Sequence, residues 1–517
     1  MRLAGNGDME MRLPLRSRLG AGLIFAFALV FAVGAAGPSC AQARSERAPK
    51  PAEYLVRRVP GAAPKLAVTA SPPIRGQALA METTRPGDIP ELDAQGWPAL
   101  VKNLRVSDER GQPVGVTLAN KSGWRLDREL AGRLIVRYEV DYSALAARGW
   151  PAPRESAFAD ANDLVVVGRS LFITTPEVGS SHVKFSLPRS WRAVTPWERR
   201  PGAADAFAAR SAQDLVENLV VLTRSAPDEV TEGRFRLLVA SMGHWQAVRP
   251  EVRETLGALV QRFVRLMEFR ERESYLVVLL PIVDSGGEAF RRSFALTVDT
   301  PPSRANRARW GNTIGHEIFH FWNGWRLRGA DYATSQWFQE GFTEYVANVS
   351  MAGAGLISPD DLRQKLAEHV RNYRRLTTSL EGGGTRKGPP LYSGGALVAF
   401  SWDVLIRDAS HGKRNLGDFL RALWRQTEGG QRTYEWRDIQ AALNATASRD
   451  WDAFYRAHIR GTDPLPLNEI LPLAGLRLAQ AEDGSPLVEL DPAAQAPARS
   501  LWQALATGRP AATAASP

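Results

Sequence analysis

Residues 315–320, with the sequence GHEIFH, decide the fold and the chemistry that we expect for this chain of 517 residues. On a helix, residues four positions apart lie on one face, so His316 and His320 can bind the same metal ion. Glu317, beside them, can accept a proton from a metal-bound water molecule. The alternative is a helix with two surface histidines and a glutamate. The two apolar residues that follow Glu317 argue against it, because they indicate a helix packed on both sides.

A third metal ligand is expected from residues 335–345 (SQWFQEGFTEY), which also have a helical pattern. A catalytic zinc usually has three protein ligands and keeps one position for water. Glu340 can complete such a site, and Glu344, on the same helix face, can accept the free N–H of a ligand histidine. The alternative for both glutamates is a solvated helix face. We predict one Zn2+ per chain, although two imidazoles and a carboxylate also suit other first-row divalent ions.

The motif pair resembles the gluzincin, or thermolysin-like, metallopeptidases, and in detail the glycyl-aminopeptidase family among them. HEIFHFWNGWRLR, from His316, resembles the aromatic-rich zinc helix of that family, and WFQEGFTEYVA, from Trp337, resembles its second zinc helix. LYSGGALVAF with DVLIR resembles its Tyr-x-x-Gly helix, and FY with GTDPLP resembles the close of its catalytic domain. The likeness runs from about residue 130 to 475. It implies zinc-dependent hydrolysis of peptide bonds, with peptides as the substrate.

The resemblance also implies a role for Tyr392 in LYSGG. Its phenol would donate a hydrogen bond to the oxyanion that forms when water adds to the scissile carbonyl, and Glu317 would act as the general base. From the residues alone, Tyr392 is a tyrosine beside glycines that follows a flexible glycine-rich loop, and a core or rim position is the alternative.

One segment departs from the family pattern. Aminopeptidases of this group place a carboxylate near the free amine of the substrate, in a Gly-Gly-x-Glu type segment before the zinc helix. Here the segment reads DSGGEAFRRS, so Gly286 and Gly287 are present but Glu288 comes one position early and Ala289 stands at the expected place. We expect Gly286, Gly287 and Glu288 to bind substrate. If Glu288 does not reach the amine, an endopeptidase on the same site is the alternative.

A second alternative is a catalytically degenerate peptide-binding protein, which the intact Glu317 argues against. Arg291 and Arg292 are either ligands for a substrate carboxylate or surface arginines. The other five histidines have no partner at ligand spacing and are interpreted as structural or surface residues: His182, His244, His369, His411 and His458. The tryptophans beside the motifs are interpreted as core aromatics, one of which can line a pocket: Trp322, Trp325 and Trp337.

The N-terminus has the pattern of a secretory signal peptide. Three arginines precede an apolar run over about residues 19–36, and a small-residue stretch ends in Ala41-Gln42-Ala43. We predict cleavage after Ala43 and an exported, periplasmic or secreted protein without a stable membrane span. One alternative is an uncleaved membrane anchor, because the run approaches the minimum spanning length of about 17 residues. The other is lipidation at Cys40.

Cleavage at this point changes the charge and cysteine counts. Residues 1–43 hold four Arg and two acidic residues, so their removal lowers the formal net charge of the chain from +10 to +8. They also hold the single cysteine, so disulfides and thiolate ligands are excluded from the mature chain. The basic residues are mainly scattered arginines without a Lys/Arg run interleaved with aromatics, which argues against nucleic-acid binding. The sequence leaves the oligomeric state open.

Strand patterns come first and helix patterns later, which predicts an α+β protein. Residues 134–142 (LIVRYEVDY) alternate as in a half-buried strand, whereas residues 250–269 have the apolar face of a helix. The predicted parts are a signal peptide at 1–43, a loose lead-in at 44–75, a β-rich, sandwich-like domain at 76–190, a thermolysin-like, mainly helical catalytic domain at 191–475, and a short extension with a disordered Ala/Pro-rich tail at 476–517. Many relatives carry a PDZ domain after the catalytic part. The segment after Pro466 is too short for one, so we do not expect it here.

Overall fold

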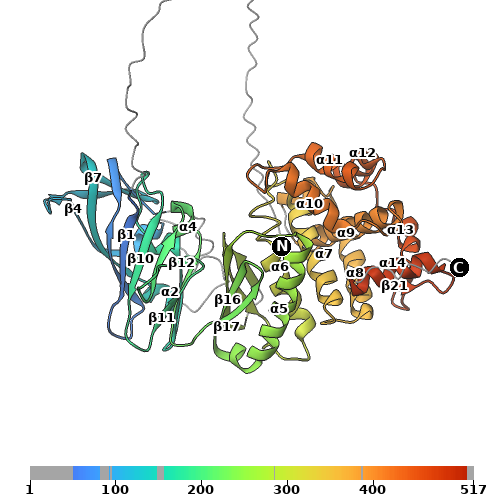
Figure 1. Cartoon of the computed structure of the whole chain (residues 1–517), viewed down its shortest axis with the longest axis horizontal. Helices are drawn as coiled ribbons and strands as arrows, with labels where there is room; N and C mark the ends of the chain where they lie inside the picture. Colours follow the sequence, from blue (N-terminus) through green and yellow to red (C-terminus); the bar gives the residue numbers. More distant parts are fainter. Residues whose placement is uncertain are drawn as a thin grey trace, which may run out of the picture. The chain divides into compact units, whose positions relative to one another are not determined.

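The computed structural model describes residues 50–81, 92, 96–147, 157–283, 286–385 and 388–508. The predicted signal peptide lies outside the described residues, as do residues 509–517 of the predicted tail. Strands dominate up to residue 298 and helices follow (Figure 1). The prediction of a β-rich N-terminal part and a mainly helical C-terminal part is therefore confirmed.

The β-rich part consists of two sheets that share one apolar core. In the described residues, the larger sheet has ten strands and is built around the long strand β7 (Gly123–Asp141), in which buried and more exposed residues alternate from Leu134 to Val140. Its other strands are β1 (Ala52–Arg58), β2 (Lys65–Ser71), β3 (Pro73–Ala80), β4 (Val101–Asp108), β5 (Pro113–Val114), β6 (Val116–Asn120), β10 (Ser181–Ser186), β12 (Glu198–Arg199) and β13 (Ala206–Ala209). The smaller sheet contains β8 (Phe158–Ala159), β9 (Asp163–Val167), β11 (Arg192–Val194) and β14 (Leu219–Thr223). Short helices lie between the strands: η1 (Trp97–Leu100), α2 (Ser143–Ala147), α3 (Gly168–Leu171) and α4 (Ala212–Val216).

The predicted loose lead-in at 44–75 is wrong where the structure describes it. β1 and β2 form an antiparallel pair, and β1 also pairs in parallel with β10, so that Ala52 lies opposite Ser181. The Pro-, Ala- and Arg-rich composition concealed a period-two alternation, in which Tyr54 and Val56 are buried while their neighbours are more exposed. The predicted boundary at residue 190 is also too early, because β11 to β14 still belong to the β-rich sheets.

A five-stranded sheet separates the β-rich core from the helices. Its order is β15-β16-β17-β19-β18, which places β18 at an edge. The strands are β15 (Asp228–Glu232), β16 (Phe235–Ser241), β17 (Glu273–Val283), β18 (Gly286–Ala289) and β19 (Ser293–Val298). Along β17, Leu276 and Val278 belong to the core of the β-rich part, whereas Tyr275 and Val277 belong to the helical core. Both faces are therefore covered, which explains the unbroken apolar run of this strand.

The helical part places the metal motif on α6 (Arg307–Phe319), which packs against α5 (Arg249–Leu266) and α7 (Gln336–Gly353) (Figure 1). α6 ends at Phe319, and His320 is its C-terminal cap. The remaining helices are η2 (Gly243–Val248), α8 (Pro359–Tyr373), η3 (Gly382–Thr385), α9 (Pro389–Ala409), α10 (Leu416–Gln426), α11 (Trp436–Thr446), α12 (Trp451–Tyr455), η4 (Arg456–Arg460), α13 (Leu467–Leu473) and α14 (Ala496–Thr507). No helix of the described residues is long and apolar enough to cross a membrane.

The predicted disordered tail is wrong over residues 496–507. These residues form α14, which follows a hairpin of β20 (Leu476–Gln480) and β21 (Pro486–Leu490). Trp502 and Leu505 of α14 are buried in the helical core. The Ala-rich composition that suggested disorder here is that of a good helix former with an apolar face.

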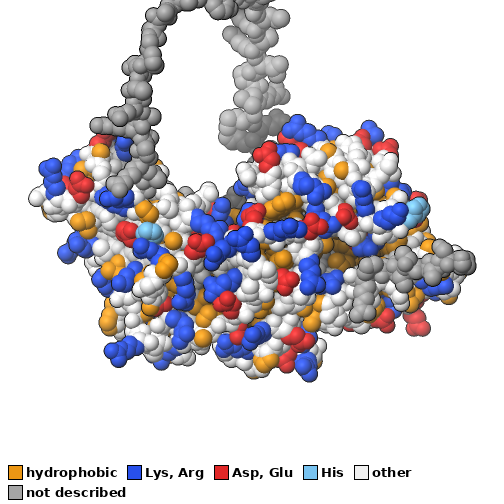
Figure 2. All heavy atoms as spheres, viewed as in Figure 1, with side chains coloured by type: hydrophobic (Ala, Val, Ile, Leu, Met, Phe, Trp, Pro, Cys, Tyr) orange, Lys and Arg blue, Asp and Glu red, His pale blue; other side chains and the backbone are white. Residues whose placement is uncertain are grey.

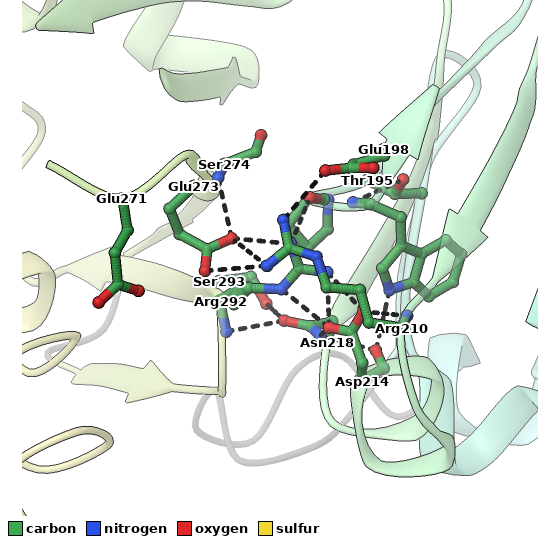
Figure 3. Close-up of polar contacts among 12 residues, drawn as sticks. Thr195, Glu198, Arg210, Asp214, Asn218, Glu271, Glu273, Ser274, Arg292 and Ser293 are labelled. Atoms are coloured by element: carbon green, nitrogen blue, oxygen red, sulfur yellow. Dashed lines mark hydrogen bonds and ion pairs between the residues drawn. The ribbon is translucent and has the colours of Figure 1, made fainter. Parts of the chain in front are cut away.

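A buried ion cluster joins the β-rich part to the five-stranded sheet (Figure 3). Arg292, in the β18–β19 hairpin, contacts Asp214 of α4 at 2.6 Å and Glu273 of β17 at 3.1 Å, and all three side chains are only 3–4% exposed. Arg210 and Arg326 also contact Glu273, at 3.2 and 3.3 Å. Arg292 is thus neither a surface residue nor a substrate ligand, and both sequence interpretations of it are wrong.

Candidate metal centre

His316 of α6, His320 directly after the end of α6 and Glu340 of α7 meet at one point. Nε2 of His316 lies 3.0 Å from Nε2 of His320, and each of these nitrogens lies 3.3 Å from Oε2 of Glu340. The three side chains offer ligand atoms that all lie within 4.8 Å of one another. Two imidazoles and a carboxylate, mutually this close, form the donor set of a catalytic zinc site, so the residues present fit zinc.

The second nitrogen of each imidazole is held by a different partner. Nδ1 of His316 lies 3.1 Å from Oε2 of Glu344, and Nδ1 of His320 lies 2.9 Å from the backbone oxygen of Asn323. Both partners are acceptors, so each Nδ1 carries the proton and each Nε2 is free to bind a metal. The structure thus brings Glu344 to the place that the sequence predicts for it.

Glu344 is itself fixed by two amides that the sequence interpretation missed. Asn312 of α6 donates to both carboxylate oxygens, at 3.1 and 3.3 Å, and Asn348 of α7 donates to Oε1 at 3.0 Å. Both residues stand four positions from a site residue, Asn312 from His316 and Asn348 from Glu344. This helical spacing is the signal that could have identified them.

Asn323 fastens the end of α6 to the start of α7. Its side-chain amide, which is fully buried, donates to the backbone oxygens of Phe338 and Gln339 and to Oγ1 of Thr343, at 3.1–3.2 Å. Its backbone oxygen orients His320, as described above. Asn323 therefore sets the position of the candidate ligand His320 relative to α7, the helix that carries Glu340.

Glycines allow α7 and α9 to touch through their backbones. A Cβ atom on Gly341 would lie 2.3 Å from Cα of Gly395, and a Cβ atom on Gly395 would lie 2.0 Å from the backbone oxygen of Trp337. This contact brings Tyr392, one turn before Gly395, to the metal ligands. The Tyr392 ring stacks on His316 with centroids 5.9 Å apart and an interplanar angle of 14°, and its hydroxyl hydrogen-bonds Glu340.

Carboxylates govern the electrostatics of this cluster. Burial lowers the pKa of His316, but hydrogen bonds with Glu340 and Glu344 outweigh burial and raise the pKa to about 10. Burial raises the pKa of Glu340, yet the charges and hydrogen bonds of the two histidines lower it well below its usual range. Burial, with the charges of Glu340 and Glu317, raises the pKa of Tyr392 well above its usual value. The cluster therefore attracts positive charge, whether a proton or a metal cation.

The cluster lies in a cleft of about 800 Å³. Glu317, Tyr392 and the three candidate ligands line it, so the structure brings together the residues that the sequence predicts for catalysis and metal binding. The loop between α6 and α7, the polar face of α8 and the start of α9 provide the other walls. A cleft of this volume accommodates a ligand the size of a short peptide.

The predicted substrate segment forms the edge strand β18. Gly286 pairs with Thr297, Gly287 with Leu296 and Glu288 with Ala295, all across the antiparallel β18–β19 pair. Ala289, the next residue, lines the cleft, so this strand reaches the site. Substrate binding by Gly286, Gly287 and Glu288 stays a prediction.

His369 is a cleft residue that the sequence interpretation missed. It is 6% exposed, its Nδ1 lies 3.1 Å from Oγ of Ser393, and its Nε2 lies 3.3 Å from Nδ2 of Asn348. Burial lowers the pKa of His369 despite the charge of nearby Glu344. The polar face of α8 that carries His369 has helical spacing, which could have identified it: Lys365, Glu368, His369 and Asn372.

Of the three tryptophans beside the motifs, two are core residues and one lines the cleft, as the sequence interpretation allowed. Trp322 and Trp337 are buried in the helical core, whereas Trp325 is half-buried and lines the cleft. The first two therefore support the packing of α6 and α7, and the third is available to contact a ligand.

Comparison with known proteins gives matches in both parts of the chain. Residues 71–221 match the Peptidase M61 N-terminal domain, and residues 309–381 match the M61 glycyl aminopeptidase. The chain is similar to the structure of an aminopeptidase N family protein from Idiomarina loihiensis, with a TM-score of 0.67 and 18% identity over 83% of this chain and 79% of that one. It is also similar to a mutant M1 zinc metallopeptidase from Deinococcus radiodurans bound to a Tyr-Ser-Ala substrate, with a TM-score of 0.50 and 15% identity over 80% of this chain and 94% of that one. A comparison with curated proteins gives no match.

The α6 motif, the glutamate of the next helix and the two-part fold define a gluzincin-type metallopeptidase. Within that class, the two family matches, which occur in the expected order along the chain, support the M61 glycyl-aminopeptidase family. The resemblance that the sequence predicts is thereby confirmed.

Proposed function

We propose that this enzyme is a zinc aminopeptidase that removes residues from the free N-terminus of short peptides. The observation that carries the proposal is the meeting of His316, His320 and Glu340 in a cleft that also contains Glu317 and Tyr392. The family match supports aminopeptidase action, and the edge strand β18 beside the cleft offers a backbone on which an extended peptide can align.

Each of these side chains has its own role in peptide hydrolysis. His316, His320 and Glu340 would hold the zinc ion, which would supply a Lewis acid for the scissile carbonyl and for the water that attacks it. Glu317 accepts the proton of the attacking water and delivers it to the leaving amine. Tyr392 donates a hydrogen bond to the oxygen on which negative charge develops.

A direct test combines metal analysis with a matched pair of peptides. The purified protein is assayed on one tripeptide with a free and with an acetylated N-terminus, before chelation, after chelation and after zinc is returned. We expect about one zinc per chain, hydrolysis of the free peptide only, and loss and recovery of activity with the metal. Glu317→Gln is expected to keep zinc while its turnover falls by about 10²–10⁴-fold.

The other outcomes identify the alternatives. Cleavage of the acetylated peptide indicates an endopeptidase on the same site. Zinc binding without hydrolysis of either peptide indicates a degenerate peptide-binding protein. Unchanged turnover in Glu317→Gln contradicts the assigned base.

We also propose that the enzyme is exported. The support is the sequence of residues 1–43, with arginines, an apolar run and the Ala41-Gln42-Ala43 end. N-terminal sequencing of the protein from cell fractions tests this. A chain that begins at Arg44 supports cleavage and export, an intact N-terminus in the membrane fraction supports an anchor, and a modified Cys40 at the N-terminus supports lipidation.

A further inference from the structure

The cleft has an uneven charge distribution. Its carboxylates are Glu317, Glu340, Glu344 and Glu368, and in the described residues its permanently cationic side chains are Arg328 and Lys365. Lys365 is neutralised by Glu368 on the same helix, at 2.9 Å. Arg328 lies on the loop between α6 and α7, and its guanidinium has no hydrogen bond or ion pair with any residue that the structure describes.

The unpaired state of Arg328 contrasts with that of Arg326 on the same loop. Arg326 contacts Glu271 and Glu273 at 3.0 and 3.3 Å and belongs to the buried ion cluster. Arg328, two positions later, is exposed and faces the cleft. Its charge is thus not used to hold the fold together.

The backbone that carries Arg328 is fixed on both sides. Leu327 is fully buried, and Gly329 forms a parallel bridge with Tyr434. The backbone oxygen of Arg328 accepts a hydrogen bond from the Tyr434 backbone N–H at 2.8 Å, and the N–H of Ala330 donates to the Tyr434 oxygen at 2.8 Å. A guanidinium on a fixed backbone loses less freedom on binding a ligand than one on a loose loop.

We propose that Arg328 binds a carboxylate of the peptide substrate that lies near the cleavage point. A guanidinium binds a carboxylate through two parallel hydrogen bonds, which gives both energy and orientation. In an extended peptide whose scissile bond lies at the metal ligands, the carboxylate is the C-terminal group of a short substrate or an acidic side chain near the cleavage point. This inference rests on the proposed peptidase function and adds the substrate class.

The test compares free and amidated peptides. Ala-Ala-Ala, its C-terminal amide and the amide of Ala-Asp-Ala are assayed with the full chain and with Arg328→Gln, Arg328→Lys and the control Arg437→Gln, an exposed arginine outside the cleft. We expect Arg328→Gln to lower kcat/KM for Ala-Ala-Ala by about 10- to 100-fold, mainly through KM, and to leave its amide unaffected. Arg328→Lys recovers part of the loss, and Arg437→Gln changes nothing.

Each result has one meaning. A loss confined to the free tripeptide assigns the C-terminal carboxylate as the partner of Arg328, and a loss confined to the Ala-Asp-Ala amide assigns the acidic side chain. An equal loss on all three peptides, or no loss on any, overturns the inference. If the unaltered protein with its full zinc content hydrolyses none of the peptides, the proposed function fails instead, and the two failures are thereby distinguished.

Discussion

Among the described residues, the buried cluster around Arg292 and the buried cluster around His316 differ in how their charges are balanced. Around Arg292, the guanidinium contacts Asp214 and Glu273. The two further arginines that contact Glu273 each have a second carboxylate partner, Glu198 for Arg210 and Glu271 for Arg326, so every charged group of this cluster has a partner of opposite charge. Around His316, carboxylates contact imidazoles, and an imidazole is charged only when it is protonated. The first cluster satisfies its own charges, whereas the second has an excess of negative charge.

The difference indicates which cluster is built for a ligand. Burying charges is costly unless each finds a partner, so a balanced cluster can serve as a fixed joint between parts of a fold. An unbalanced cluster needs a cation from outside, and the geometry at His316, His320 and Glu340 suits a divalent metal. On the surface in Figure 2, by contrast, Lys and Arg side chains lie mixed with Asp and Glu, where water screens them.

The largest expected effect comes from removing a carboxylate from the unbalanced cluster. Glu340→Gln keeps the shape of the side chain but lowers its affinity for the metal, so we expect the zinc content to fall well below one per chain. Hydrolysis is expected to fall by at least about a thousandfold. Metal analysis and the peptide assay measure both. The matched control is Glu368→Gln, a cleft carboxylate outside the cluster, and equal zinc loss in the two variants would contradict the assignment of Glu340.

The next effect comes from breaking the balanced cluster. Arg292→Met leaves Asp214 and Glu273 buried with fewer partners, so we expect the free energy of unfolding to fall by about 3–5 kcal/mol. Zinc content at a temperature where the variant is folded is expected to stay at the level of the unaltered chain. Urea unfolding and metal analysis test this, with the exposed Arg304→Met as control. A variant that loses zinc while it remains folded would show that the two clusters are not separate.

The smallest effect on the site is expected from a change at Glu344, which orients the candidate ligand His316 and is not itself a candidate ligand. Glu344→Gln weakens the hydrogen bond to Nδ1 of His316 but keeps the amide-sized side chain in place. We expect zinc affinity to fall by about 10- to 100-fold, with activity restored by excess zinc. Competition with a chelator of known affinity measures the change. Unchanged zinc affinity would mean that Asn312 and Asn348 suffice to hold this side of the site.

The sequence can indicate the candidate metal ligands because most of them are close together along the chain. His316 and Glu317 lie on one helix with His320 as its C-terminal cap, and Glu340 and Glu344 share the next, so helical spacing places them on two facing sides. Tyr392 has no such local signal and was found only through the family resemblance. Arg292 was misinterpreted because its partner Asp214 lies 78 positions away, and no pattern around FRRS marks one arginine as buried.

In the β-rich part, too, prediction from the sequence fails where a structure depends on residues far apart along the chain. The alternation in β7 is strong over residues 134–142 and predicts a strand correctly, whereas β1 and β2 lie in a Pro- and Arg-rich context that suggests a lead-in. β1 pairs with β10 and β2 pairs with β7, both far along the chain, and these pairings leave no trace in the local composition. The hydrogen-bond partners of His369 likewise come from other helices, α7 and α9, although the spacing of polar residues on α8 is a local signal.

The backbone contact of Gly341 with Gly395 has a consequence for anyone who wishes to transplant this site into another scaffold. Grafting His316, His320, Glu340 and Tyr392 as side chains is not enough, because the tyrosine reaches the ligands only when two helices cross at a distance that excludes every Cβ atom. The crossing point itself has to be copied as a piece of backbone geometry. A host whose helices are spaced by ordinary side chains can offer the ligands but leaves the phenol out of reach.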